Sequence, residues 1–209
     1  MENCMTGNLT RLCGNVNGRP VFSHYGRSRK FYVFPLSVPR LSGAEDVINI
    51  VCGEEQLKAL EPDSSTMLKV TGELRSYNNK SGVGNRLLIF VYANEMTLCE
   101  AAPENLISLR GTLCKRPVLR TTPLGREICD ILIAVNRPFG RSDYLPCISW
   151  GQNAREAARW SIGDMIELEG RVQSRNYVKS AEGRQVCKTA FEVSSSSVRR
   201  TEPDSALKI

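Results

Sequence analysis

Three large aromatic residues lie within twelve positions of one another in the segment "VNRPFGRSDYLPCISWG", and two arginines stand among them. The rings are Phe139, Tyr144 and Trp150, and the cations are Arg137 and Arg141. An exposed ring can stack on another flat ring, and a neighbouring guanidinium can neutralise an anion such as a phosphate. The same rings would pack in a hydrophobic core if the segment were a half-buried strand. Whether the rings bind a ligand or pack in the core depends on the strands that carry them.

Alternation along the expected strands favours an exposed surface. The even positions from Tyr144 to Trp150 share one face of a strand, but both of its faces carry apolar residues. The segment 165–174 is clearer, because one face holds Ile166, Leu168, Gly170 and Val172. The other face, continued to its end, holds Arg171, Gln173, Arg175 and Tyr177. A face with arginines and a terminal tyrosine is not a core face, so we expect the rings to bind a ligand.

Positive charge is concentrated in the second half of the chain. Residues 1–104 hold 11 Lys and Arg against 11 Asp and Glu, residues 105–198 hold 14 against 9, and residues 199–209 hold 3 against 2. The net charges are therefore 0, +5 and +1. Cations beside stacking rings are typical of a surface that binds nucleic acid. The expected phosphate contacts are Lys115, Arg116, Arg120, Arg126, Arg137, Arg141, Arg175 and Lys179.

An internal repeat divides the chain into two similar units. "NLTRLCGNVNGRPV" from Asn8 realigns with "NLISLRGTLCKRPV" from Asn105, which places Gly14 on Gly111 at an offset of 97. A later match places Gly72 on Gly170 at an offset of 98. We therefore expect one unit at 1–100 and a second at 105–198, joined by "EAAPEN" and followed by a short flexible tail at 199–209.

Each unit has the pattern of short strands with one helix. In the second unit we expect strands at 106–113, 127–136, 143–150, 165–174 and 184–193. The segment "QNAREAARWSIGD" predicts a helix between the third and fourth strands, with Gly163 to end it and Trp160 to pack it on the barrel. This order predicts an all-β chain with short helices, folded as two tandem five-stranded Greek-key barrels of the OB-fold type.

The second unit resembles the bacterial single-stranded DNA-binding protein family. Its "RPVLRTTPLG", "AVNRPF", "DYLPCISWG" and "GDMIELEGRVQSRNY" follow the order and spacing of that family, and the first unit matches more weakly. The resemblance implies that Phe139, Tyr144, Trp150 and Tyr177 stack on unpaired bases. It also implies a particle of four OB-folds, and hence a homodimer of this chain. Family members commonly recruit replication or recombination proteins through an acidic tail, which the nearly neutral end of this sequence lacks.

The remaining chemistry of the sequence is sparse. Cysteines number eight, but none stands in C-x-x-C spacing and His24 is the only histidine, so we expect neither a metal site nor a cofactor. The thiols are expected to be reduced and structural. We predict that the protein is not an enzyme, because no nucleophile, base and carboxylate assemble in the sequence. No segment has the length of a membrane span or the plan of a signal peptide, so the expected location is the bacterial cytoplasm, with the nucleoid.

Two other functions fit the same residues. A primosome-type or RNA-binding OB protein would keep the fold and act through protein or RNA contacts. A nucleic-acid enzyme such as a nuclease would need a carboxylate or histidine cluster, which the sequence does not show.

The two units are not expected to be equivalent. At the offsets of the repeat, Phe139 falls on Ser42, Tyr144 on Val47, Trp150 on Gly53 and Tyr177 on Asn79. A first unit without these rings and without net charge would be structural or an interface. The alternative is that it stacks bases in another pose with Phe22, Tyr25 or Tyr32.

Overall fold

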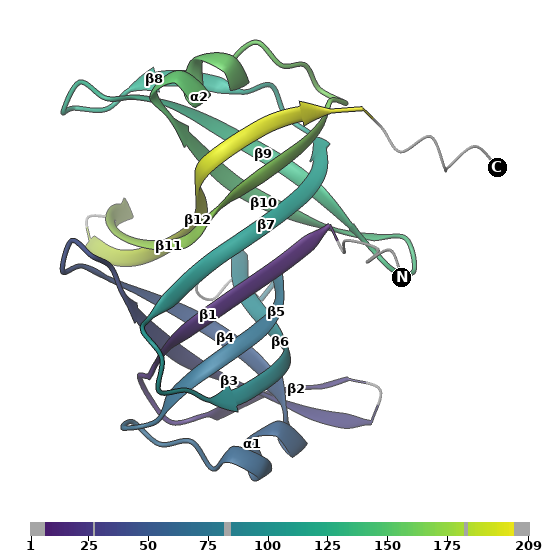
Figure 1. Ribbon diagram of the computed structural model, residues 1–209, viewed down its shortest axis with the longest axis vertical. Coiled ribbons are helices and arrows are strands. Elements are labelled where there is room, and N and C mark those ends of the chain that lie inside the picture. The colour runs from purple at the N-terminus through teal and green to yellow at the C-terminus, as the bar shows by residue number, and fades with distance from the viewer. Residues whose placement is uncertain (1–6, 27, 82–84, 182–183, 203–209) are drawn as a thin grey trace. The chain divides into compact units, whose positions relative to one another are not determined.

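The computed structural model describes residues 7–26, 28–81, 85–181 and 184–202, and these fold into two β-barrels (Figure 1). Leu9–Leu106 together with Val172–Phe191 form one compact unit, and the rest of the described residues form the other. The chain is all-β with two short helices, as the sequence predicts. Because each helix has seven residues, no helix in these described ranges is long enough to cross a membrane.

The first barrel is closed by five strands, with a sixth on its edge. The strand order is β2-β3-β4-β6-β5-β1, and a further pairing of β3 with β1 closes the ring. Among the strands that the structure describes, β2 pairs with β3 alone, and their hairpin projects from the barrel in Figure 1. The elements are β1 (Asn8–Val16), β2 (Val21–Gly26), β3 (Arg29–Pro39), β4 (Glu45–Gly53), α1 (Glu54–Leu60), β5 (Met67–Asn78) and β6 (Leu87–Leu98).

The second barrel repeats this plan strand for strand. Its order is β7-β11-β12-β10-β9-β8, and β7 also pairs with β9 to close the five-stranded ring. The elements are β7 (Glu104–Leu113), β8 (Val118–Thr121), β9 (Glu127–Arg137), β10 (Arg141–Trp150), α2 (Gly151–Ala157), β11 (Met165–Ala181) and β12 (Arg184–Thr201). Both barrels therefore have the predicted OB-fold ring, with the helix between the third and fourth barrel strands.

The glycines that reveal the repeat are required where two strands cross closely. A Cβ on Gly14 would lie 2.4 Å from the carbonyl oxygen of Ser37, and one on Gly111 would lie 2.7 Å from that of Ala134. No side chain fits at such a distance, so both barrels need glycine at this crossing. Closure of the barrel is thus the physical reason for the repeated spacing.

Several predicted boundaries were wrong. The short outer strands β2 and β8 were not predicted, because each is brief and flanked by proline or glycine. Helix α2 ends at Ala157, earlier than predicted, because the amides of Arg159 and Trp160 bond to carbonyls three residues back and tighten the chain into a 3₁₀ turn. Trp160 is nevertheless buried, in line with its predicted packing role.

The chain was also expected to become mobile from about Ser194, and this is wrong for Ser194–Thr201. Those residues continue β12, and Ser195 is buried with its hydroxyl oxygen 2.9 Å from that of Ser149. The strand persists because its serines bond to neighbouring strands and Val198 packs inward. Residues 203–209 of the predicted tail lie outside the described ranges.

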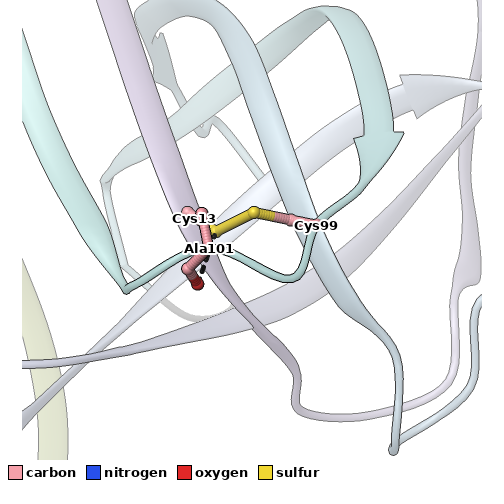
Figure 2. Close-up of a disulfide and its surroundings, with 3 residues drawn as sticks. All are labelled: Cys13, Cys99 and Ala101. Carbon is pink, nitrogen blue, oxygen red and sulfur yellow. Dashed lines mark hydrogen bonds between the residues drawn. A yellow bond between two sulfur atoms is a disulfide. The ribbon is translucent and has the colours of Figure 1, made fainter.

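Two of the cysteines form a disulfide, which corrects the expectation that all thiols are reduced. Cys13 of β1 is bonded to Cys99, which directly follows β6, and the sulfur of Cys13 lies 3.9 Å from the carbonyl oxygen of Ala101 (Figure 2). Sequence spacing could not predict this pair, because 86 residues separate the two positions.

Three of the four free cysteines that the structure describes, Cys52, Cys129 and Cys147, are buried core residues. Burial raises the pKa of the Cys52 thiol to about 12 and raises the pKa of the Cys147 thiol further. Because a buried thiolate is disfavoured, these side chains stay protonated and inert at neutral pH. Among the residues that the structure describes, no group of three or more His, Cys, Asp or Glu is arranged to hold a metal.

Candidate nucleic-acid interface

The outward face of the β8–β9–β10 sheet presents Tyr144 and Trp150. On β10 the residues Asp143, Leu145, Cys147 and Ser149 are buried in the barrel, so Tyr144 and Trp150 point outward as predicted. Trp150 pairs with Ile128 of β9, which pairs in turn with Arg120 of β8, so these three lie in one row across the sheet. Six residues along a strand separate the two rings by about 20 Å.

Phe139 lies in the tight turn that joins β9 to β10, and its ring is 84% exposed. Its backbone has φ 65°, which is uncommon for a bulky residue and costs free energy of about 1–3 kcal/mol. Strain of this kind is typical of functional positions. The turn thus holds a large exposed ring at the same end of β10 as Tyr144, although its backbone strain lowers the stability of the fold.

Trp150 is held in place by a hydrogen bond. Its indole Nε1 donates to the Ser194 hydroxyl on the neighbouring strand β12, at 3.0 Å. The Trp150 side chain is half-buried, whereas Tyr144 is 47% exposed. A bonded indole with its remaining surface open is a preorganised stacking platform, because little side-chain freedom is left to lose on binding.

Arg137 has a structural partner as well as a place beside the rings. Its guanidinium Nε lies 3.1 Å from Asp143, whose side chain is fully buried. The first barrel repeats this pair as Arg40 and Asp46, where the hydrogen bond to the carboxylate raises the pKa of Arg40. A buried carboxylate needs a cation close by, so Arg137 neutralises Asp143.

Arg120 is likewise paired. Its guanidinium donates to both carboxylate oxygens of Asp130, at 2.6 and 3.0 Å, and this hydrogen bonding raises the pKa of Arg120. The pair is half-exposed, and exposed pairs contribute little stability. Arg120 therefore needs to exchange Asp130 for a phosphate in order to act as predicted.

The other predicted cations of this barrel are exposed around the rings. Lys115 and Arg116 precede β8, Arg126 follows it in the turn to β9, and Arg141 begins β10. No ion pair of these four side chains is found within the described ranges, so their charge is available to a ligand. Arg175 is exposed on the distal part of β11, which belongs to the other compact unit. The side chains of Tyr177 and Lys179 lie outside those that the structure describes.

Sequence reasoning missed the apolar part of this surface. Leu119 on β8 and Leu124 in the following turn are exposed, and Leu124 is 85% so. Both stand in the "RPVLRTTPLG" run, where apolar residues flanked by cations were a usable signal. Exposed leucines beside rings and arginines extend the surface that a base could contact.

Residues 104–200 match the family model described as the single-strand binding protein family. Over these residues, somewhat less than half of its length, the chain is similar to that family. The match covers the whole of the second barrel with the rings and cations described above. The first barrel lies before the matched residues.

Curated relatives of the family agree with this match. Single-stranded DNA-binding protein 2 of Listeria innocua is 37% identical over 106 residues, which are 47% of this chain and 65% of that protein. Single-stranded DNA-binding protein A of Bacillus subtilis is 35% identical over 106 residues, or 47% and 60% of the two chains. The chain therefore spans less than two thirds of the length of these relatives.

A solved structure resembles the chain over both barrels. The wild-type single-stranded DNA-binding protein from Thermus aquaticus superposes with a TM-score of 0.77 over 96% of each chain, at 19% identity. This likeness concerns the fold, and it shows that a tandem arrangement of two OB-folds occurs elsewhere.

Proposed function

We propose that the protein binds single-stranded DNA by stacking unpaired bases on Phe139, Tyr144 and Trp150 while nearby cations contact phosphates. The supporting observation is that one barrel surface exposes strained or bonded aromatic rings next to arginines and a lysine without ion pairs. Stacking accepts any base, because every base has a π-face. Such binding would protect exposed strands during replication, recombination, repair or the transfer of mobile elements.

A titration of Trp fluorescence tests this proposal directly. The chain has two tryptophans, and Trp160 is buried, so quenching on binding should come from Trp150. Trp150→Ala should weaken binding to oligo(dT) by roughly 1–3 kcal/mol and remove the quenching. The logarithm of the binding constant should fall linearly with the logarithm of the salt concentration, with a slope of about −0.7 per phosphate contacted. Equal binding to matched duplex or to RNA, or equal affinity of Trp150→Ala and the parent, would contradict the proposal.

In this proposal the two barrels have different roles. Residues 105–198 form the main nucleic-acid-binding unit, and residues 1–100 form a degenerate unit whose main role is structural or at an interface. Support comes from the charge, which is +5 for 105–198 and 0 for 1–104. Arg175, Tyr177 and Lys179, with Arg137 and Arg120, complete the proposed contact set.

We further propose that the protein acts without catalysis, as a homodimer with four OB-folds. The similarity of residues 104–200 to the single-strand binding protein family supports this and supports a location in the bacterial cytoplasm, with the nucleoid. Replication or recombination proteins are the expected further partners, although the predicted tail has 3 basic and 2 acidic residues and offers no acidic recruiting segment.

A further inference from the structure

The first barrel has Gly53 where the second has Trp150, but it carries aromatic rings on the two strands beside that glycine. In the second barrel Trp150 pairs with Ile128 and bonds to Ser194. In the first barrel Gly53 replaces the tryptophan at the offset of 97, and its cross-strand partner is Phe31, which replaces Ile128. Rings are therefore exchanged between cross-strand neighbours.

A third position, on the parallel neighbouring strand, also gains a ring in the first barrel. On the parallel neighbour, Ile148 pairs with Ser194 in the second barrel, and the equivalent Val51 pairs with Tyr92 in the first. Tyr92 thus replaces Ser194, and its ring centroid lies 5.8 Å from that of Phe31. Where one barrel has one ring and two partners without rings, Ile128 and Ser194, the other has two rings around a glycine.

The backbone does not require glycine at position 53. Gly53 has φ −76° and ψ 155°, which any residue adopts, and a Cβ there would meet only the side-chain oxygen of Gln56, at 3.7 Å. Gly14 and Gly72, in contrast, have no room for a side chain. Glycine at position 53 therefore leaves the surface beside the contacting rings of Phe31 and Tyr92 open.

Gly53 lines a pocket of about 490 Å³ on the first barrel, which is within the usual size range of ligand sites. The rings of Phe31, Tyr92 and Tyr25 contribute to its wall, and Tyr25 is 67% exposed. Phe31 already stacks with the imidazole of His24, at a centroid distance of 5.0 Å and an interplanar angle of 12°. This face of Phe31 is therefore occupied, and a base that stacked on it would take the place of the His24 imidazole.

The charges at the pocket fit a nucleotide. Arg29 and Lys30 line it and are exposed, and the guanidinium of Arg75 lies 3.8 Å from the centre of the Tyr92 ring. Of the two acidic residues, Glu54 is engaged by Lys30 and Lys58, each at 3.6 Å. Cations at the rim attract phosphate, while the rings between them match the π-face of a base.

We infer that this pocket is a second base-stacking site, in which Phe31, Tyr92 and Tyr25 hold an unpaired base of single-stranded DNA next to Arg29 and Lys30. The inference rests on the proposed function for its ligand but uses residues on the other barrel. It means that the first barrel contributes to DNA binding through rings placed on different strands.

Blocking the pocket in the full chain tests the inference. Gly53→Leu should extend a side chain into the pocket without backbone strain, and Thr97→Leu places a leucine at an exposed position of β6 outside the pocket. Both are measured with and without Trp150→Ala, on a mixed-sequence single strand. In the Trp150→Ala background, Gly53→Leu should weaken binding by about 5- to 150-fold and Thr97→Leu should not.

A second readout keeps the test independent of folding. Photocross-linking of halogenated single strands to the unmutated chain should give adducts on the peptides that contain Tyr25, Phe31 or Tyr92. If the parent bound no single strand, the proposed function would fail. If the parent bound but Gly53→Leu matched Thr97→Leu and no adduct formed at these rings, the inference alone would be overturned.

Discussion

At the scale of single residues, two neighbouring arginines of the second barrel have different tasks. Arg137 is directed at the fully buried Asp143, whereas Arg141 is exposed and makes no ion pair within the described ranges. We predict that Arg137→Ala lowers the free energy of unfolding by about 3–5 kcal/mol, because it leaves a buried carboxylate without this cation. Arg141→Ala should leave stability unchanged and reduce the salt slope of DNA binding by about 0.7.

Thermal unfolding and a salt titration of the two variants decide between these roles. The matched variant Arg40→Ala should behave like Arg137→Ala in the unfolding experiment, because Arg40 and Asp46 form the equivalent pair of the first barrel. A stable Arg137→Ala protein with weakened DNA binding would show instead that Arg137 is mainly a phosphate contact.

Glu55 gives the inferred pocket a chemical preference. Glu54 bonds to Lys30, Lys58 and Tyr32, whereas the exposed carboxylate of Glu55 has no ion pair among the described side chains. A carboxylate accepts hydrogen bonds from the amino group of cytosine, which thymine lacks. With Trp150→Ala to weaken the main site, binding to oligo(dC) should exceed binding to oligo(dT), and Glu55→Gln should reduce that difference. An unchanged ratio would mean that Glu55 does not face the base.

At the scale of elements, the disulfide ties the first strand of the first barrel to the residue after its last strand. A crosslink over 86 residues restricts the unfolded chain strongly, and native disulfides of this kind typically stabilise by about 2–4 kcal/mol. We predict that reductant lowers the unfolding temperature of the parent. The variant Cys13→Ala/Cys99→Ala should have the lower value from the start and show no further response to reductant.

The redox state of this disulfide in the cell can be measured directly. Cytosolic thiols are mostly kept reduced, so alkylation before lysis and peptide mapping would show whether Cys13 and Cys99 are paired there. An identical unfolding temperature of parent and double variant, with and without reductant, would contradict a stabilising disulfide.

Strand alternation predicted the core elements well, because its signal is local. The buried Leu145 and Cys147 alternate with the outward Tyr144, and Ile166, Leu168 and Val172 are buried as expected. Gln173 was expected outward but is buried. Strand β8 was missed because four residues between prolines carry almost no periodic signal.

Tertiary pairing explains why the site of the first barrel was not predicted. Comparison of equivalent positions finds Gly53 where Trp150 stands and concludes that the ring is absent. Only the register shows that Phe31 and Tyr92 occupy the two strands beside that glycine. An alignment of equivalent positions does not detect a ring that lies on the neighbouring strand.

At the scale of the whole molecule, charge and rings are distributed differently. Rings occur on both barrels, but the excess positive charge belongs to residues 105–198. Long-range attraction of a strand should therefore depend mainly on residues 105–198, and residues 1–100 should add stacking once the strand is bound. This order fits a binder whose affinity is salt-dependent and whose contact length exceeds one barrel.

The last prediction concerns assembly. Two OB-folds in one chain and an expected particle of four OB-folds require a homodimer, which light scattering should report as twice the monomer mass at micromolar concentration. Strand edges and exposed apolar side chains such as Leu98 and Leu106 are groups that a second chain can cover. Leu98→Lys and Leu106→Lys should shift the population toward monomer if they lie in that contact, with Leu41→Lys, in the exposed turn after β3, as the control. A parent that stays monomeric over this concentration range would exclude the homodimer.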